Sequence, residues 1–335
     1  GKICSDYTGT AGRVVDVTGG ELIINGGTIT TEGMAKTGSA VYIGGSGIVT
    51  MHGGKVCADN ADNKAENNAV NVKNGSFTME GGEITADSND AGTNTNAISG
   101  TSSNITINNG QVTGPTAITA PFATTTISGG TFIGAVTVKA KSIRGGTFES
   151  ANKRTYAVVS KSGTVTIAPA EGKNVTISGA HGGVGIDGGT ATINGGSYGS
   201  SDYYGLYVSN DEGTATVTVN GGTFNGKDYS VLIGSDGKNE VTSTLTIKNG
   251  TFNKPIHAQE NTGTGAIQVS GGTFSDPVDP AYCASGFIPT STTENGVTTY
   301  GVKKGSYVAS VTTADGTVTE YGDLQAAFDA ASNGD

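Results

Sequence analysis

The stretch LIINGGTI at residues 22–29 decides the fold, because versions of it return throughout the chain. Ten copies align on the first glycine of the pair or on an asparagine that replaces it, and the series ends with IQVSGGTF at residues 267–274. The anchor positions are 26, 53, 81, 109, 129, 145, 195, 221, 249 and 271. A repeat of this period indicates a solenoid, in which each repeat packs on its neighbours.

The spacing between anchors is uneven, which indicates that insertions are confined to loops while stacked strands keep their register. One long gap contains a degenerate coil at residues 175–179. A second strand lies between the signatures, for example at residues 40–43 and 231–233. Both strands alternate with period two, so one side faces inward. We therefore predict an all-β fold, a right-handed parallel β-helix (β-solenoid) of about twelve coils.

The last hydrophobic position of the signature changes from aliphatic to aromatic along the chain. It is occupied by Ile29, Val56, Ile84, Val112, Phe132, Phe148, Tyr198, Phe224, Phe252 and Phe274. We expect an internal side-chain stack, because neighbouring coils lie about 4.8 Å apart. The glycines should form a corner that needs positive φ, and Asn109 and Asn249 should adopt the same left-handed conformation.

The chain divides into three segments by the loss of the signature. Residues 1–282 form the predicted β-helix, and residues 283–305 form a predicted C-terminal cap hairpin around Asn295-Gly296. Residues 306–335 are expected to be the start of a following module, with a strand pair and a short helix that stops at Asn333-Gly334.

Charge and composition exclude several partners. The formal net charge is −10, which argues against nucleic acid and anionic membrane surfaces. The chain has no run of 18 apolar residues, so membrane insertion is not expected. Its three cysteines form no CxxC pair, and Cys57 should pack as a small hydrophobic residue.

Three parts of the sequence resemble modules of large surface proteins from gram-positive gut bacteria. They are the TxTIxGGTF coils, the exit AYCASGF followed by GVTTYGVKKG, and the ending TEYGDLQAAFDAASNGD. The resemblance implies a monomeric fragment of a longer tandem protein that is secreted or attached to the cell surface, with its signal and anchor outside these residues. It also implies adhesion to host material, glycan contact or superantigen-like capture of immunoglobulin.

Pectate lyases and polygalacturonases also have parallel β-helices, so catalysis must be considered. General acid and base chemistry needs titratable groups that converge. Here arginine occurs only at positions 13, 144 and 154, and His52, His181 and His257 are far apart in sequence. We expect no catalytic residue.

We also expect no metal ion and no cofactor. The stretch GVGIDG at residues 183–188 satisfies the dinucleotide pattern GxGxxG but opens no helix. Acidic loops at residues 58–63 and 87–90 offer oxygen ligands that calcium prefers, yet their spacing fits hydrated insertions better.

The outward position of the second strand turns apolar in the last third of the chain. The candidate partner-binding residues are Tyr203, Tyr204, Tyr207, Tyr229, Leu232 and His257. Tyrosine beside small polar residues gives contact area at a low entropy cost. The alternative is that Tyr156, Tyr204 and Tyr229 share a column and only stack on one another.

A flat sheet face suits a large partner better than a small molecule, which is usually held in a concave pocket. We therefore expect a non-catalytic, adhesin-like cell-surface module that contacts a host protein, such as immunoglobulin or mucin, or a glycan. A carbohydrate-active enzyme, either a polysaccharide lyase or a glycoside hydrolase, and a passive surface spacer are the alternatives.

Overall fold

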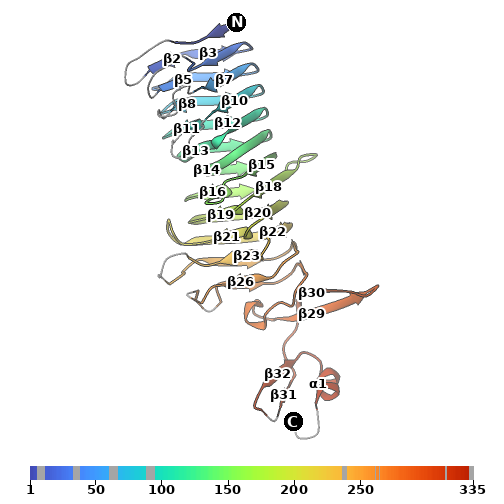
Figure 1. The fold of residues 1–335 in the computed structure, drawn as a ribbon. Coiled ribbons are helices and arrows are strands. Elements are labelled where there is room, and N and C mark those ends of the chain that lie inside the picture. Colours follow the sequence, from blue (N-terminus) through green and yellow to red (C-terminus); the bar gives the residue numbers. More distant parts are fainter. Residues whose placement is uncertain are drawn as a thin grey trace.

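The computed structural model describes residues 1–5, 12–32, 38–59, 67–87, 95–235, 240–260, 262–263, 265–313 and 315–331. The protein is all-β and forms a parallel β-solenoid of about nine turns, which is seen from the side in Figure 1. Two earlier expectations fall outside the described residues. They are the calcium alternative, for residues 60–63 and 88–90, and the helix stop at Asn333-Gly334.

Each turn passes through three sheet faces, which we name A, B and C in chain order after the glycine pair. Face A contains β1 (Lys2–Ile3), β4 (Thr28–Thr30), β7 (Lys55–Ala58), β10 (Glu83–Ala86), β15 (Gly146–Ser150), β18 (Val175–Gly179), β25 (Thr251–Phe252) and β28 (Thr273–Phe274). Face B contains β2 (Gly12–Val17), β5 (Gly38–Ile43), β8 (Asn67–Val72), β11 (Asn96–Gly100), β16 (Tyr156–Ser160), β19 (Gly182–Ile186), β21 (Tyr204–Val208), β23 (Tyr229–Ile233) and β26 (Ile256–Ala258). Face C contains β3 (Glu21–Ile24), β6 (Ile48–Met51), β9 (Ser76–Met79), β12 (Asn104–Ile107), β17 (Thr164–Ile167), β24 (Thr244–Ile247) and β27 (Ile267–Val269).

Four long strands run through corners and contribute to more than one face. They are β13 (Gln111–Ile127), β14 (Thr131–Ile143), β20 (Gly189–Ser200) and β22 (Ala215–Asn225). Strands of one face pair in parallel with the strands above and below, so a given position of the coil forms a column along the rod. Side chains then alternate between the inside and the outside of the coil.

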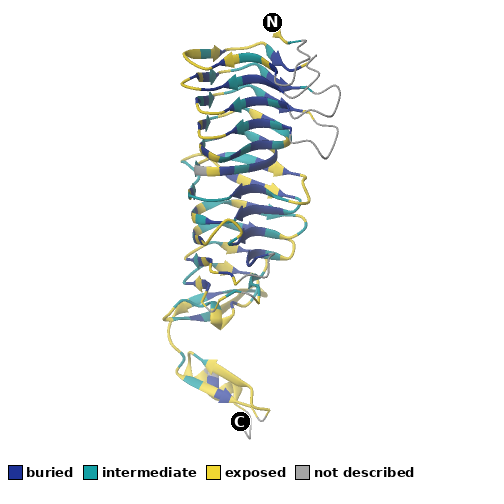
Figure 2. Ribbon diagram, turned by 90° about the vertical axis from the view of Figure 1, so that its left-hand side faces the viewer, coloured by how far each residue is buried: buried dark blue, intermediate teal, exposed yellow. Residues whose placement is uncertain are grey.

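The inward columns form one continuous core, drawn in dark blue in Figure 2. The expected internal stack is confirmed, because Phe132 and Phe148 lie parallel with ring centroids 4.6 Å apart. Phe224 lies 4.8 Å from Tyr198 and 5.1 Å from Phe252, and all three are fully buried. The degenerate coil joins the same column through Ile177, which pairs with Phe148 and Tyr198.

The corner before face A uses positive φ only at the second residue of the glycine pair. At Gly54, with φ of 89°, a Cβ would lie 2.7 Å from a carbonyl oxygen of the previous coil. The expectation of a left-handed Asn109 and Asn249 is wrong, since the positive φ belongs to the following Gly110 and Gly250. The first position of the pair can therefore carry a side chain, whereas the second needs glycine.

After the last coil the chain forms a short 3₁₀ helix (Pro280–Tyr282) and the antiparallel hairpin β29 (Phe287–Glu294) and β30 (Val297–Lys304). The hairpin turns at Asn295 and Gly296, both with positive φ, as expected for a two-residue turn. Beyond it lie the antiparallel pair β31 (Ala309–Thr312) and β32 (Val318–Tyr321) and the helix α1 (Leu324–Ala330).

Two further features of the described residues bear on the sequence analysis. The side chain of Cys57 is buried, and this burial raises the pKa of its thiol, as expected for a packed cysteine. No helix in the described ranges has the length and apolar character needed to cross a membrane.

Candidate binding face

The predicted outward column of face B is present in register. Tyr207 pairs with Leu232, which pairs with His257, so the three residues lie on consecutive coils. In the neighbouring column Tyr204 pairs with Tyr229. The sequence pattern thus placed these residues on the correct face and in the correct order.

Their exposure differs from the expected open ribbon. Tyr207 is 2% exposed and Leu232 is 1% exposed, whereas Tyr203 is 41% exposed. The reason is that rings from the adjacent column cover Tyr207, with Tyr156 at 5.4 Å and Tyr204 at 5.8 Å between centroids. Tyr207 and Leu232 therefore form the floor of the face.

Aromatic rings from consecutive coils join into one group, which we name the aromatic cluster. It consists of Tyr156, His181, Tyr203, Tyr204, Tyr207, Tyr229 and His257. His181 makes edge contacts with Tyr156 at 5.0 Å and with Tyr203 at 4.9 Å. Tyr229 stacks on His257 at 4.8 Å. Such offset and edge-to-face contacts hold aromatic side chains in fixed orientations.

Two glycines make room for the first ring of this cluster. A Cβ on Gly182 would lie 2.2 Å from the Tyr156 ring, and a Cβ on Gly185 would lie 2.8 Å from it. The ring of Tyr156 therefore lies flat over a gap in face B and reaches Tyr207 on the coil beyond. Sequence reasoning placed Tyr156 in a column with Tyr204 and Tyr229 only as a stacking residue, and it missed His181. Two glycines beside the tyrosine column were a usable signal.

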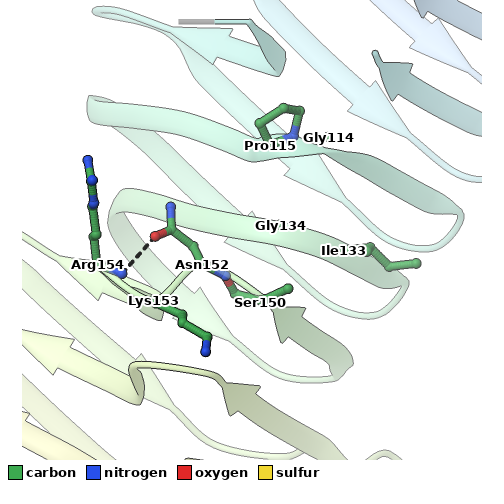
Figure 3. A pocket seen from close by; sticks show the side chains of 9 residues that line it. Gly114, Pro115, Ile133, Gly134, Ser150, Asn152, Lys153 and Arg154 are labelled. Atoms are coloured by element: carbon green, nitrogen blue, oxygen red, sulfur yellow. Dashed lines mark hydrogen bonds between the residues drawn. The ribbon is translucent and has the colours of Figure 1, made fainter. Parts of the chain in front are cut away.

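A hollow of about 500 Å³ lies beside the cluster at the corner between faces A and B, and we name it the first hollow. Figure 3 shows Pro115, Ile133 and Arg154 around it. It exists because the connections at Gly114-Pro115 and Gly134 are short, whereas the next coil has the longer connection 151–155. The corner is recessed over two coils and filled again on the third.

A second hollow of about 370 Å³ continues from the first toward the cluster. The two share Ile133, Ser150 and Ala151, and the second extends to Ala180 and Ser201. These last two residues lie next in sequence to His181 and close to Tyr203. Together the hollows and the cluster form one surface along the rod, which we name the candidate binding face.

Hydrogen bonds hold the connection 151–155 in a fixed shape. The Asn152 amide N–H donates to Ser150 Oγ at 3.3 Å, and Asn152 Oδ1 accepts from the Arg154 amide N–H at 2.8 Å. His181 Nδ1 lies 3.1 Å from the carbonyl oxygen of Lys153, so a protonated Nδ1 would donate to it. The loop is therefore tied to itself and to the next coil.

The same bonding continues on the following coil. Ser200 Oγ donates to the carbonyl oxygen of His181 at 2.9 Å and accepts from the Tyr203 amide N–H at 3.0 Å. The Tyr203 carbonyl oxygen in turn accepts from the Asp228 amide N–H at 3.0 Å. The exposed ring of Tyr203 is thus mounted on a rigid support.

Two cations lie on the rim of the first hollow. Lys153 and Arg154 are exposed, and neither side chain forms an ion pair within the described part of the chain. Glu149 is an exposed carboxylate that lines the second hollow. The candidate binding face therefore carries a local positive group at one end, in a chain whose formal net charge is −10.

An acidic group that includes Asp187 lies where face B strands end, since Asp187 directly follows β19. Burial, followed by the nearby charge of Asp211, raises the pKa of Asp187 from its ordinary 3.8 to about 6. Lys161 Nζ forms an ion pair with Glu212 Oε1 at 2.8 Å. A hydrogen bond from Ser209 opposes part of the rise in the pKa of Asp187. These residues line neither hollow. Within the described ranges, no group of three or more His, Cys, Asp or Glu side chains is placed to hold a metal ion.

In the N-terminal half of face B, polar side chains surround Tyr42. The Arg13 guanidinium lies 3.4 Å from the centroid of the Tyr42 ring and forms an ion pair with Asp16 at 2.6 Å. Further along, Asn96 donates to Asn68 Oδ1 at 3.0 Å.

Comparisons with protein-family models, curated proteins and solved structures find no match for the chain.

Proposed function

We propose that this chain is a non-catalytic module of a secreted or surface-attached bacterial protein, and that it contacts a host macromolecule such as immunoglobulin or mucin. The observation that carries the proposal is the aromatic cluster, whose rings cross consecutive coils on the outside of the rod. Tyrosines on a rigid support, among small polar residues, are typical of recognition surfaces.

The shape of the face supports a large partner. Its accessible rings are spread along the rod beside two open hollows, and Tyr207 and Leu232 support them from below. A long, shallow surface offers repeated contacts to a protein or a polymer chain, whereas drug-sized molecules are usually held in enclosed pockets. The proposal includes the resemblance to surface modules of gram-positive gut bacteria described above.

The proposal also includes the finer architecture. Right-handed crossovers are the rule between parallel strands, which supports a right-handed helix. The consecutive parallel pairings of face A run through twelve strand passages from β1 to β28, which supports a count of about twelve coils. Antiparallel pairing of Tyr300 with Phe274 supports the role of the hairpin at 283–305 as a cap, with a new module starting at 306.

Binding of the purified chain to a panel of immunoglobulins and mucins tests the function, with biolayer interferometry as the readout. The variant Tyr203→Ala/Tyr229→Ala removes two accessible rings, and we expect affinity to fall roughly tenfold to a hundredfold. Tyr42→Ala is the matched control, because Tyr42 is a tyrosine on the same face near the other end of the rod.

The outcomes separate the proposal from its alternatives. If the double variant and the control lose affinity equally, the contact does not lie on the aromatic cluster. If no member of the panel binds, a passive spacer becomes the better explanation.

One observation favours an enzyme as the second candidate. The raised pKa of Asp187 suits a general acid, and Asp211 lies close enough to affect it. Release of reducing ends from polysaccharides, abolished by Asp187→Asn, would establish that a carbohydrate-active enzyme is present.

A further inference from the structure

We infer that the two hollows and Tyr203 form a site for an oligosaccharide that carries a carboxylate, with the acidic sugar in the first hollow. The inference rests on the proposed function and names the chemistry of one ligand for the candidate binding face. Three properties of the surface carry it: two cations on an ordered loop, polar groups that suit sugar hydroxyls, and an exposed aromatic ring, all on consecutive coils.

The cations are the first argument. Arg154 and Lys153 lie on the rim of the first hollow, and the Arg154 backbone is fixed by Asn152 Oδ1 at 2.8 Å. Guanidinium groups bind carboxylates through two parallel hydrogen bonds, and such charge-assisted bonds are stronger than neutral ones. Because hydrogen bonds within the loop and to His181 already order the loop backbone, binding costs little backbone conformational entropy there.

The second hollow supplies groups that suit sugar hydroxyls. Glu149 accepts hydrogen bonds, and the hydroxyls of Ser178 and Ser201 both donate and accept. Ile133 and Ala151 present apolar surface between them, which suits the C–H face of a sugar ring. The hollow thus combines polar and apolar surface, as a sugar does.

Tyr203 continues the site at its other end. Its ring is 41% exposed and is held at the edge by His181 at 4.9 Å. The negative face of an aromatic ring attracts the positive C–H edge of a partner, which is how a tyrosine holds the flat side of a sugar. Arg154, His181 and Tyr203 belong to consecutive coils, so the backbone distance from the first to the last is roughly 10 Å. A short oligosaccharide along the rod axis spans this distance.

Paired probes that differ in the carboxylate test the site. One pair is a galacturonate trisaccharide and its methyl ester, and the other is sialyllactose and lactose. In calorimetric titrations of the intact chain, an acidic probe that binds should have a Kd about tenfold lower than that of its neutral partner. The two pairs also distinguish a uronic acid source from a sialylated one.

Substitutions assign the effect to named residues. Lys153→Gln/Arg154→Gln should abolish the preference for the acidic probe, while Arg144→Gln, an exposed arginine outside both hollows, should keep it. Tyr203→Ala should weaken the acidic and neutral probes alike. Circular dichroism of each variant checks that the coil is intact.

The inference is overturned if the acidic and neutral probes bind equally, if the preference survives in Lys153→Gln/Arg154→Gln, or if no sugar binds. The proposed function survives each of these results as long as Tyr203→Ala/Tyr229→Ala still loses binding to immunoglobulin or mucin. If that binding is also absent from the wild-type chain, both proposals fail.

Discussion

Removing one ring from the internal stack should destabilise the coil strongly, and Phe224→Ala is the clearest case. Phe224 is fully buried and lies between two parallel rings, Tyr198 at 4.8 Å and Phe252 at 5.1 Å. Truncation of a buried Phe to Ala costs about 3–5 kcal/mol. Each ring contact contributes about 0.5–1.5 kcal/mol beyond buried area, so the cost should be about 4 kcal/mol or more.

The assay must allow for unfolding that is not all-or-none, because coils of a solenoid interact only with their neighbours. Guanidinium titration followed by circular dichroism measures the loss of stability. Amide hydrogen exchange then locates it, and β20, β22 and β25 should lose protection first. Phe122→Ala is the control, since Phe122 is 71% exposed and its loss should cost less than about 0.5 kcal/mol. Equal effects of the two substitutions would refute the role of the stack.

Two further predictions follow from face B. Because the pKa of Asp187 is raised to about 6, the folded state favours its protonated form, so its contribution to stability is greatest below pH 3.8 and is lost as pH rises through 6. Asp187→Asn should therefore raise the free energy of unfolding at pH 8 by about 1–2 kcal/mol, after allowance for solvent screening, and change it little at pH 4. Urea titrations at both pH values check this prediction. An equal change in the free energy of unfolding at both pH values would contradict it. Gly182→Ala should lift Tyr156 from Tyr207, since the new Cβ would lie 2.2 Å from the ring, and should weaken partner binding; a crystal structure with Tyr156 unmoved would show the reasoning to be wrong.

The coil was predictable because its physical rule is local and periodic. Alternation in the signature places Phe224 and its column inside, and the structure confirms the stack. The same alternation placed Tyr207 and Leu232 on the outside of face B but could not show that neighbouring rings cover them. Exposure depends on how long side chains lean along the rod, and period two carries no information on that tilt.

The hollows were beyond sequence reasoning for a different reason. They arise from a difference in loop length between adjacent coils, which has meaning only after the coils are stacked in register. A signal was present, since the anchors at 109, 129 and 145 are separated by the shortest steps in the series, 20 and 16 residues.

The prediction of a left-handed Asn109 was wrong because the corner position that needs positive φ is one residue later.

The unequal connections between faces A and B also have a consequence for how such a protein can change. Gly134 joins the two faces with almost no loop, while residues 151–155 join them on the next coil without disturbing the strand register. Because surface connections tolerate insertion while the strands hold the stack, this corner can be diversified coil by coil. Grafting new loops at positions such as 114–115 or 134 offers a route to new specificities on an unchanged rod, much as variable loops serve on other rigid scaffolds.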